Sequence, residues 1–244
     1  MSVIGGGPGG QRVVCIVQAR LGSNRLPGKC LKALHGEPLI AHVFQRAITI
    51  RGVDQVVLAT SHQERDSPLS DYVYGTLGLD VFRGDETDVL RRYLYAGIHF
   101  QADVVMRITG DCPFLAPDVA EAVLHAYWGE PLGVEYVTND TTCSGYPDGV
   151  DVEVFSMGLL EMAAGRSYHP SDREHVTSWM RREVPNGMIK AEADWSKWKL
   201  SVDSPEDYDF AVRLADKLPR TGERDARYSL QTTLRAVEEM VRGE

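Results

Sequence analysis

The sequence predicts an α/β fold, a single domain built on a mostly parallel central sheet flanked by helices, with a small and partly antiparallel insertion. Short apolar runs alternate with segments of helical periodicity up to about residue 128. This alternation is typical of βαβ units and a parallel sheet. Beyond that residue the pattern is less regular, which indicates the insertion. No linker divides the chain, so residues 12–244 are expected to form one domain.

The first part of the chain predicts strands and helices in alternation. Leu39, Val43 and Ala47 recur at helical spacing, and Pro38 before them suits the first turn of a helix. Asp85 or Thr87 is the expected cap of the third helix. The expected strands are 13–17, 55–59, 80–82 and 104–108, and the expected helices are 39–50, 67–77, 87–100 and 117–127.

The second part predicts a mixed arrangement. Ser171 is followed three residues later by Glu174, which is the pattern of a capping box at a helix start. The last helix carries Leu234, Val237 and Met240, which suit packing on the body of the protein or on a partner. The expected strands are 134–138, 150–155 and 199–202, and the expected helices are 158–164, 171–182, 205–218 and 230–241.

Composition and charge exclude several function classes. The 244 residues are 43% hydrophobic and 25% charged, as in an ordinary globular protein. The net charge is −9 and the isoelectric point about 5.3, whereas a nucleic-acid-binding domain is typically basic, so no nucleic-acid partner is expected. No apolar run approaches the roughly 18 residues of a membrane span, and no signal peptide is recognisable, so no membrane partner is expected either.

The spacing of the cysteines does not predict a zinc site. None of the four lies two or three residues from another, as zinc ligands usually do. Two of them fall inside apolar or motif segments, so we expect reduced thiols and a cytoplasmic location. The four are Cys15, Cys30, Cys112 and Cys143.

The glycines near the N-terminus match a dinucleotide-binding pattern without its context. Residues 3–10 read VIGGGPGG, which fits G-x-G-x-x-G and would suggest a flavoprotein. That fingerprint needs a strand before the glycines and a helix after them, and here an apolar, strand-like run follows. We therefore expect residues 1–11 to form a flexible arm.

The loop that follows the first strand is the strongest candidate site. It reads QARLGSNRLPGK and carries three cations, Arg20, Arg25 and Lys29, together with Gly22 and Gly28. In open α/β sheets, ligands bind beyond the carboxyl ends of the strands. Cations and closely approaching backbone N–H groups suit a triphosphate. The alternative is a solvated basic loop. It is not a Walker loop, because neither Ser nor Thr follows Lys29.

The longer stretch QARLGSNRLPGKCLKALHGEPLIAHV resembles the signature of the cytidylyltransferase family. That family includes the CMP-Kdo synthetases, the acylneuraminate cytidylyltransferases and the SpsF-type spore-coat polysaccharide proteins, and the last branch is the most similar in wording. Asn24 and Cys30 stand where the family usually has other side chains. The resemblance implies that this loop embraces a nucleotide triphosphate through Ala19, Arg20, Gly22, Ser23, Arg25 and Lys29.

The resemblance also implies a fold and a reaction. The fold is that of a nucleotide-diphospho-sugar-transferase-like (GT-A-like) domain. The reaction is transfer of a cytidylyl group from CTP to a small anionic acceptor, an acidic sugar or a phosphonate, with Mg²⁺ as cofactor and pyrophosphate as product. Arg20 and Lys29 would stabilise charge on the phosphates. Relatives commonly form homodimers.

Two aspartates are the candidate metal ligands, because magnesium usually binds one or two carboxylates together with substrate phosphates. Asp111 follows the strand 104–108, and Asp203 ends the run 199–202. The family carries a G-D-x-P-like turn and a later V-D-[ST]-P-E-D-like segment, and both are present here, from which the resemblance implies that Asp111 and Asp203 bind the metal. Alternatively, Asp203 is the N-cap of the following helix and Asp111 a turn residue. Their separation along the chain does not predict that they meet.

The base and ribose are expected at the ends of the second and third strands. In the family, a strand end such as VVLATS lies against the pyrimidine, and a segment such as RGDETDVL lies near base and ribose. The alternative role of Asp85 and Asp88 is helix capping. The residues implied to bind CTP here are Ala59, Thr60, Ser61, Gly84 and Asp85.

The acceptor is expected in the less regular part. Asp151 and Glu153 alternate with valines, so they share one face of a strand. They could bind hydroxyls, or form the solvated face of an edge strand. Arg173 and His175 could bind an anion, or lie on an exposed helix face. The candidate acceptor-binding residues are Arg107, Asp148, Asp151, Glu153, Arg173 and His175.

Two further functions stay open at this point. A uridylyl- or guanylyltransferase acting on a sugar phosphate would have the same architecture, and the strand end that reads the base distinguishes it. A binding protein without turnover would also keep the fold. The intact loop and the two aspartates argue against that second possibility.

Overall fold

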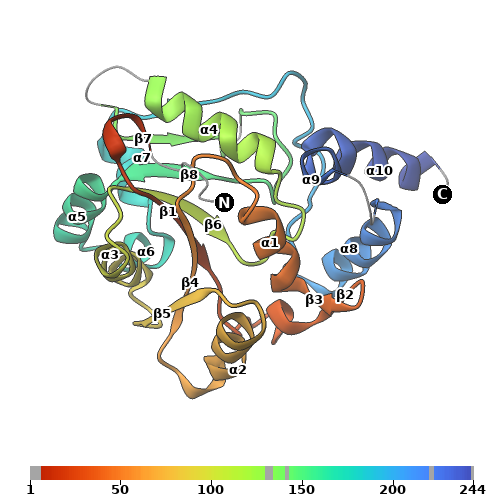
Figure 1. Cartoon of the computed structure of the whole chain (residues 1–244), viewed down its shortest axis with the longest axis horizontal. Coiled ribbons are helices and arrows are strands. Elements are labelled where there is room, and N and C mark those ends of the chain that lie inside the picture. The colour runs from red at the N-terminus through yellow and green to blue at the C-terminus, as the bar shows by residue number, and fades with distance from the viewer. Residues whose placement is uncertain (1–6, 130–133, 141–142, 220–222, 243–244) are drawn as a thin grey trace.

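A central sheet of seven strands organises the molecule (Figure 1). The computed structural model describes residues 7–129, 134–140, 143–219 and 223–242. The strand order is β5-β4-β1-β6-β8-β7-β9, with a separate hairpin β2-β3. The strands are β1 Val13–Gln18, β2 Ala33–Leu34, β3 Glu37–Pro38, β4 Gln55–Ser61, β5 Asp80–Gly84, β6 Val104–Thr109, β7 Tyr136–Thr138, β8 Glu153–Ser156 and β9 Gly187–Met188.

Among the described strands of this sheet, β8 alone runs against the others, since β7 is antiparallel to β8 and β9 is parallel to β7. Strands β5, β4, β1 and β6 are parallel to one another, as the alternating pattern predicts. Strand β8 runs antiparallel to β6, with Arg107 opposite Glu153, and β7 runs antiparallel to β8. The mostly parallel α/β fold with a partly antiparallel insertion is therefore confirmed.

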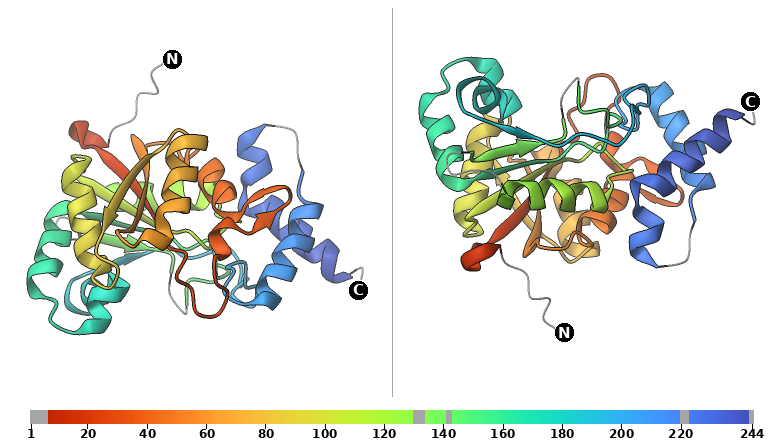
Figure 2. Two further views of the ribbon diagram at one scale, coloured as in Figure 1. Left: turned by 90° about the horizontal axis from the view of Figure 1, so that it is seen from below. Right: turned by 90° about the horizontal axis from the view of Figure 1, so that it is seen from above.

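Helices cover both faces of the sheet (Figures 1 and 2). The side chains of β1 alternate between two apolar clusters: Val13, Cys15 and Val17 pack with α1 and α4, whereas Val14 and Ile16 pack with α3 and α5. Helices α8 and α10 pack together at one end of the molecule. The helices are α1 Leu39–Ala47, α2 Ser67–Asp71, α3 Val89–His99, α4 Pro117–Gly129, α5 Met157–Arg166, α6 Pro170–His175, α7 Ser178–Glu183, α8 Pro205–Lys217, α9 Arg224–Tyr228 and α10 Leu230–Arg242.

Several expected elements are wrong in detail. The helix expected at 171–182 is two helices, because Val176 has a φ of 59° and interrupts the hydrogen-bonding pattern, and His169 caps α6 in place of Ser171. The helix expected at 67–77 is the short α2 followed by a π-helical turn, Tyr72–Thr76. The strand expected at 199–202 is an isolated bridge between Asp148 and Lys199.

Caps and the chain start also differ from expectation. Asp88 caps α3, because its side chain accepts a hydrogen bond from the backbone N–H of Arg91. Residues 1–6 of the expected arm lie outside the described residues. Residues 8–10 form one 3₁₀ turn that leads directly into β1, so the strand–glycine–helix unit of a flavoprotein is not formed there.

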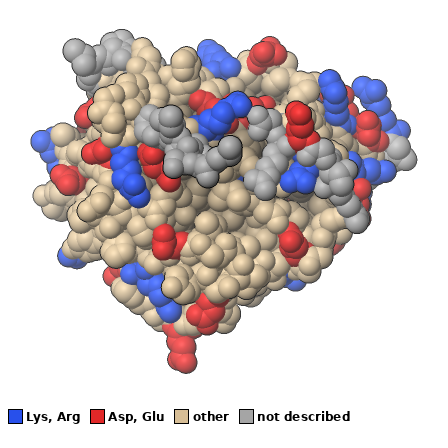
Figure 3. All heavy atoms as spheres, in the orientation of Figure 1, with Lys and Arg blue, Asp and Glu red and all other residues tan. Residues whose placement is uncertain are grey.

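The surface charges are mixed. On the face shown in Figure 3, basic and acidic side chains are interspersed, and no single basic stripe of the kind that tracks nucleic acid is present among the described residues on that face. Among the described helices, none is long and apolar enough to cross a bilayer. The last helix packs on the body of the protein, where Leu234, Val237 and Met240 are buried.

Candidate active site

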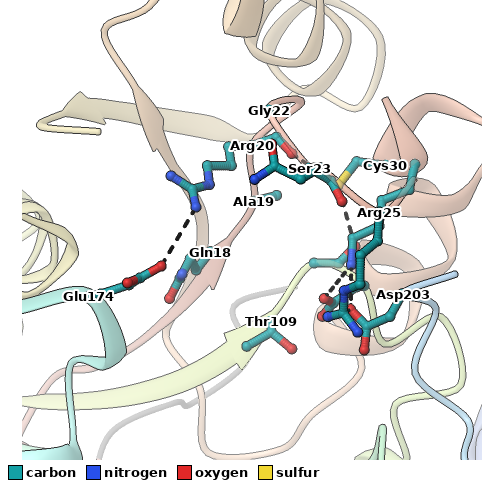
Figure 4. Close-up of a pocket in the computed structure, with 14 residues that line it drawn as sticks. Gln18, Ala19, Arg20, Gly22, Ser23, Arg25, Cys30, Thr109, Glu174 and Asp203 are labelled. Carbon is teal, nitrogen blue, oxygen red and sulfur yellow. Dashed lines mark hydrogen bonds and ion pairs between the residues drawn. The ribbon is translucent and has the colours of Figure 1, made fainter. Parts of the chain in front are cut away.

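A cavity of about 460 Å³ opens at the carboxyl ends of β1 and β6 (Figure 4). The loop after β1 forms one wall, and the turn after β6 forms another. This is the position at which open α/β sheets bind ligands. The lining residues are Gln18, Ala19, Arg20, Gly22, Ser23, Asn24, Arg25, Lys29, Cys30, Thr109, Gly110, Asp111, Glu174 and Asp203.

The loop after β1, residues 19–29, is called the first loop, and hydrogen bonds from its backbone N–H groups hold it in place. The N–H of Leu21 donates to the carboxylate of Asp66 at 2.7 Å, and Asp66 is fully buried. The N–H of Gly28 donates to the carbonyl of Leu21 at 3.1 Å. Gly28 has a φ of 68°, a left-handed conformation that a glycine adopts easily. It is followed directly by the short helix that begins at Lys29. The loop is thus a defined structure that points Lys29 into the cavity.

Lys29 joins the two aspartates that the sequence singles out. Its Nζ lies 2.7 Å from Asp111 Oδ2 and 3.0 Å from Asp203 Oδ1, and it also donates to the carbonyl of Val202 at 2.7 Å. Burial lowers the pKa of Lys29, but the two carboxylates raise it by more, so the ammonium stays protonated. Lys29 is only 8% exposed, and this ion cluster forms the floor of the site.

Asp203 is not the helix N-cap. Ser204 caps α8, and its side chain and that of Asp207 form a reciprocal capping box. The carboxylate of Asp203 is therefore available to the cavity. Burial raises its pKa, but hydrogen bonds from Lys29 and Lys199 lower it by more, so the group is ionised.

Asp111 reaches the site because the turn after β6 packs closely on β1. A Cβ on Gly110 would lie 2.6 Å from the Cβ of Ala19 and 3.1 Å from the carbonyl oxygen of Gln18, so only glycine fits. The carbonyl of Asp111 accepts a hydrogen bond from the N–H of Val202 at 2.9 Å, which ties the two carboxylate-bearing segments together.

Arg25 and Arg20 also face carboxylates. Arg25 lies 2.9 Å from Asp203 Oδ1. Arg20 lies 3.9 Å from a carboxylate oxygen of Glu86 and 3.9 Å from one of Glu174. Such half-exposed pairs are weak, so a polyanion could displace them. Neither glutamate was assigned to the site from the sequence: Glu174 was expected only as part of a capping box, and Glu86 only as one residue of the segment near base and ribose.

The donor set of the cavity fits a hard divalent cation that shares its ligands with a substrate. Asp111 and Asp203 offer partly exposed carboxylate oxygens around one point. No cluster of three or more His, Cys, Asp or Glu that could hold a metal by itself is found among the described residues. Magnesium binds in this way, through one or two carboxylates and the phosphates of a nucleotide.

The residues expected to read the base lie at the ends of β4 and β5, beside the cavity rather than lining it. Ser61 lies opposite Gly84 in the parallel pair, and Ala59 and Thr60 are fully buried. The hydroxyl of Ser61 donates to Asp66, so it supports the first loop. The hydroxyl of Thr60 is buried without a hydrogen-bond partner among the described residues.

Asp85 closes the turn that leads into α3. Its carboxylate accepts hydrogen bonds from the N–H groups of Thr87 and Asp88, each at 2.8 Å. These bonds lower the pKa of Asp85. Its observed role is therefore that of a turn residue next to the cap, close to the alternative that the sequence allowed.

Glu153 is the centre of a buried ion cluster. It is 1% exposed and accepts hydrogen bonds from Arg107, from Arg181 Nη2 at 2.7 Å, and from the hydroxyls of Tyr136 and Thr177 at 2.6 Å each. The interpretation of this segment as a solvated edge strand is wrong, because β8 lies between β6 and β7. The cluster therefore joins β6, β7 and β8 to α7 through one buried carboxylate.

Asp148 and Asp151 lie between this cluster and the two cavity aspartates. Asp148 accepts a hydrogen bond from the hydroxyl of Ser201 at 2.8 Å, and Asp151 accepts one from the N–H of Gly149 at 2.8 Å. Burial, together with nearby carboxylates such as Asp140, raises the pKa of Asp151 to about 7. These two residues occupy the seam between β8 and the segment that carries Asp203.

A second cavity of about 450 Å³ adjoins the first. Arg20 and Glu174 line both. Arg173 also lines the second cavity, where it lies 3.3 Å from Asp88 and donates to the carbonyl of Ala164 at 2.9 Å. His175 is exposed and lines neither cavity. Of the acceptor residues expected on this helix, Arg173 alone lines one of these two cavities.

Comparison with known proteins identifies relatives of this chain. The family model for cytidylyltransferases matches residues 14–218. The spore coat polysaccharide biosynthesis protein SpsF of Bacillus subtilis is 31% identical over 215 residues, which cover 84% of this chain and 87% of that protein. The structure of a cytidylyltransferase from Leptospira borgpetersenii superposes with a TM-score of 0.84 at 25% identity, covering 96% of this chain and 95% of that one.

A more distant structure shows the same fold. A CMP:2-keto-3-deoxy-manno-octonic acid synthetase complexed with CTP superposes with a TM-score of 0.66 at 19% identity, covering 84% of this chain and 98% of that one. The match of the family model includes the first loop, the turn with Asp111 and the segment with Asp203. The chain belongs to the cytidylyltransferase family of nucleotidyltransferases, in which the resemblance to the SpsF-type branch is confirmed.

Proposed function

We propose that the protein transfers a cytidylyl group from CTP to a small anionic acceptor, a sugar acid or a phosphonate. An acceptor oxygen forms a bond to the α-phosphorus, the bond from that phosphorus to the oxygen bridging the β-phosphorus breaks, and pyrophosphate leaves. A hydroxyl acceptor gives up its proton to solvent, whereas a phosphonate oxygen carries none. The observation that carries the proposal is the convergence of Lys29, Asp111 and Asp203 in one cavity.

The cations of the first loop bind the triphosphate in this proposal. Arg20, Arg25 and Lys29 exchange their carboxylate partners for phosphate oxygens, and Ala19, Gly22 and Ser23 bring the backbone close to them. Preorganised cations of this kind stabilise the charge that develops on the leaving group. Mg²⁺, when bound by Asp111 and Asp203, would supply further positive charge to the phosphate oxygens.

The cytosine lies against the ends of β4 and β5. Ser61 lies opposite Gly84 in this parallel pair, and Ala59 and Thr60 are buried behind this rim. Ser61 and Asp85 hold the two turns that shape this end of the site. A uridylyl- or guanylyltransferase would need a different base contact here, so nucleotide preference tests this assignment.

The acceptor occupies the second cavity and the neighbouring region between β8 and the segment that carries Asp203. Arg173 offers a cation, and the shared residues Arg20 and Glu174 connect its cavity with the nucleotide. We assign Asp148, Asp151 and His175 to the acceptor as well, although none of the three lines either cavity. Arg107 and Glu153 support this wall from the buried ion cluster.

The setting of the enzyme forms part of the proposal. Cys15, Cys30 and Cys112 are buried free thiols, which suits the reducing cytoplasm. A homodimer is proposed as well, and light scattering coupled to gel filtration measures it directly.

The decisive experiment measures pyrophosphate release from CTP, UTP, GTP and ATP with Mg²⁺, across a panel of sugar acids and phosphonates. Release that requires CTP and one acceptor class supports the proposal. Preference for UTP or GTP would assign the other nucleotidyl transfer. CTP binding without release from any acceptor would favour a binding protein without turnover.

A further inference from the structure

Arg92, on α3, is a buried cation that forms no ion pair with a described residue. It is 1% exposed, and its Nη1 donates to the backbone carbonyl of Asp85 at 2.8 Å. Its Nε and Nη2 are also buried, and they have no hydrogen-bond partner in the part of the chain that the structure describes. Arginine is rarely buried unless an opposite charge pairs with it, because the loss of hydration is expensive. The described fold therefore leaves the charge of this guanidinium uncompensated.

The turn after β5 connects Arg92 to the wall of the active site. The carbonyl of Asp85 accepts a hydrogen bond from Arg92, and the next carbonyl, that of Glu86, accepts one from Arg20 Nη1 at 3.4 Å. Arg20 lines both cavities of the active site. Burial is the main cause that lowers the pKa of Arg92, and the charge of Arg20 lowers it further. The two guanidinium groups thus bind adjacent residues of one turn and repel each other.

The carboxylates near Arg92 are bound by other groups. Asp66 accepts hydrogen bonds from the backbone of the first loop and from the hydroxyl of Ser61. Asp85 accepts hydrogen bonds from two backbone N–H groups of its own turn. A ligand in the adjoining cavity is the remaining source of negative charge, and in the proposed function that ligand is a triphosphate.

We infer that Arg92 is a positioning residue that strengthens triphosphate binding through Arg20 and the turn after β5, without contacting the ligand. The inference rests on the proposed function. A positive charge in buried surroundings acts on an anion in the cavity more strongly than a charge in water. Its repulsion also favours the transfer of Arg20 from Glu86 to a phosphate oxygen. The uncompensated charge destabilises the protein without ligand, and a bound polyanion reverses part of that effect.

Arg92→Met tests the inference, because it removes the charge and keeps an unbranched side chain of similar length. Calorimetry on the full chain at constant ionic strength gives the dissociation constants of inorganic tripolyphosphate, CTP and CMP. The variant should bind tripolyphosphate and CTP at least about tenfold more weakly, and CMP should lose less because it carries fewer charges. Without ligand, the variant should be as stable as the native chain in urea or more stable, because a buried unpaired charge is replaced by an apolar group.

Two further variants serve as controls. Arg92→Lys keeps the charge and should retain most of the affinity for tripolyphosphate. Arg91→Met should leave all three affinities unchanged, because Arg91 is the neighbouring arginine on α3 but is exposed and stacks on Tyr95.

A purely structural role of Arg92 predicts a different result. Arg92→Met would then be less stable than the native chain, or would not fold, and CTP and CMP would lose affinity by the same factor. Either result, or equal binding of tripolyphosphate by Arg92→Met and the native chain, would overturn the inference. A native chain that binds tripolyphosphate but not CTP would refute the proposed function, and the effect of Arg92→Met on tripolyphosphate binding would still decide the inference.

Discussion

Asp111 and Asp203 accept hydrogen bonds from one ammonium group, that of Lys29, at 2.7 and 3.0 Å. The two aspartates come from different parts of the chain, one after β6 and one before α8. The lysine therefore occupies the point at which the two carboxylates converge. A divalent cation that binds these carboxylates has to share them with Lys29 or to displace it.

Lys29→Gln is expected to separate metal binding from catalysis. Removal of the ammonium leaves two carboxylates facing each other, so the variant should bind Mn²⁺ more tightly than the native chain without nucleotide, on the order of tenfold. The same variant should transfer the cytidylyl group at least about 100-fold more slowly, because it lacks a charge on the phosphates. Calorimetry with Mn²⁺ and an assay of pyrophosphate release measure the two effects. Weaker Mn²⁺ binding by the variant would contradict a competition between lysine and metal.

Asp203→Asn and Ser204→Ala form a matched pair that separates a site residue from a capping residue. Ser204 caps α8, so Ser204→Ala should lower the free energy of unfolding by about 1 kcal/mol and leave the rate nearly unchanged. Asp203→Asn should reduce the rate at least about 100-fold with a smaller effect on unfolding. Urea unfolding and pyrophosphate release are compared on the same preparations. Equal effects of both variants on the rate would show that Asp203 has a structural role only.

Gly110→Ala tests the close packing that places Asp111. The new methyl group would meet Ala19 and the backbone of Gln18, so the turn has to move away from β1. We expect a large loss of activity, and a loss of stability of about 1–3 kcal/mol, which is typical of overpacking. Gly165→Ala is the control, because a Cβ there meets nothing within 4 Å. Unchanged activity in Gly110→Ala would show that the position of Asp111 is not critical.

Asp151 should make the protein less stable as the pH rises. The pKa of Asp151 is about 7 in the folded protein and close to 3.8 in an unfolded chain, so the folded form binds the proton more tightly. Between these values each pH unit lowers the free energy of unfolding by at most about 1.4 kcal/mol. Asp151→Asn still accepts the hydrogen bond from Gly149 and should be more stable than the native chain at pH 8. Urea unfolding at pH 5 and pH 8 measures this, and equal slopes for both proteins would contradict it.

Local patterns predicted the nucleotide half of the fold well, because they determine its elements directly. The apolar run of β1, the helical spacing of α1 and the loop with Lys29 all follow from neighbouring residues. The meeting of Asp111 and Asp203 depended on the family resemblance, since no spacing in the sequence encodes a contact between distant turns. The contact arises from nonlocal packing, in which the N–H of Val202 binds the carbonyl of Asp111.

The second half was harder to predict because tertiary contacts override local preference there. Val176 is a β-branched residue with a φ of 59°, a positive value that local propensity disfavours. The adjacent Thr177 donates to the buried Glu153, so the break in the helix serves the ion cluster. The alternation around Glu153 suggested an edge strand, because a sequence pattern does not show that β8 lies between β6 and β7.

Because β8 runs opposite to β6, two kinds of chain segment meet at the edge of the sheet that carries the candidate active site. Strands β1, β4 and β6 leave the sheet at this rim, whereas β8 enters it there, with Glu153 opposite Arg107. The nucleotide side of this rim is therefore built from loops that follow parallel strands. The other side is built from the segment that leads into β8, which is held by its antiparallel pairing with β6. Insertions and substitutions in that segment can accumulate without moving the first loop. In the proposed reaction, one nucleotide-binding scaffold can in this way take up different acceptors.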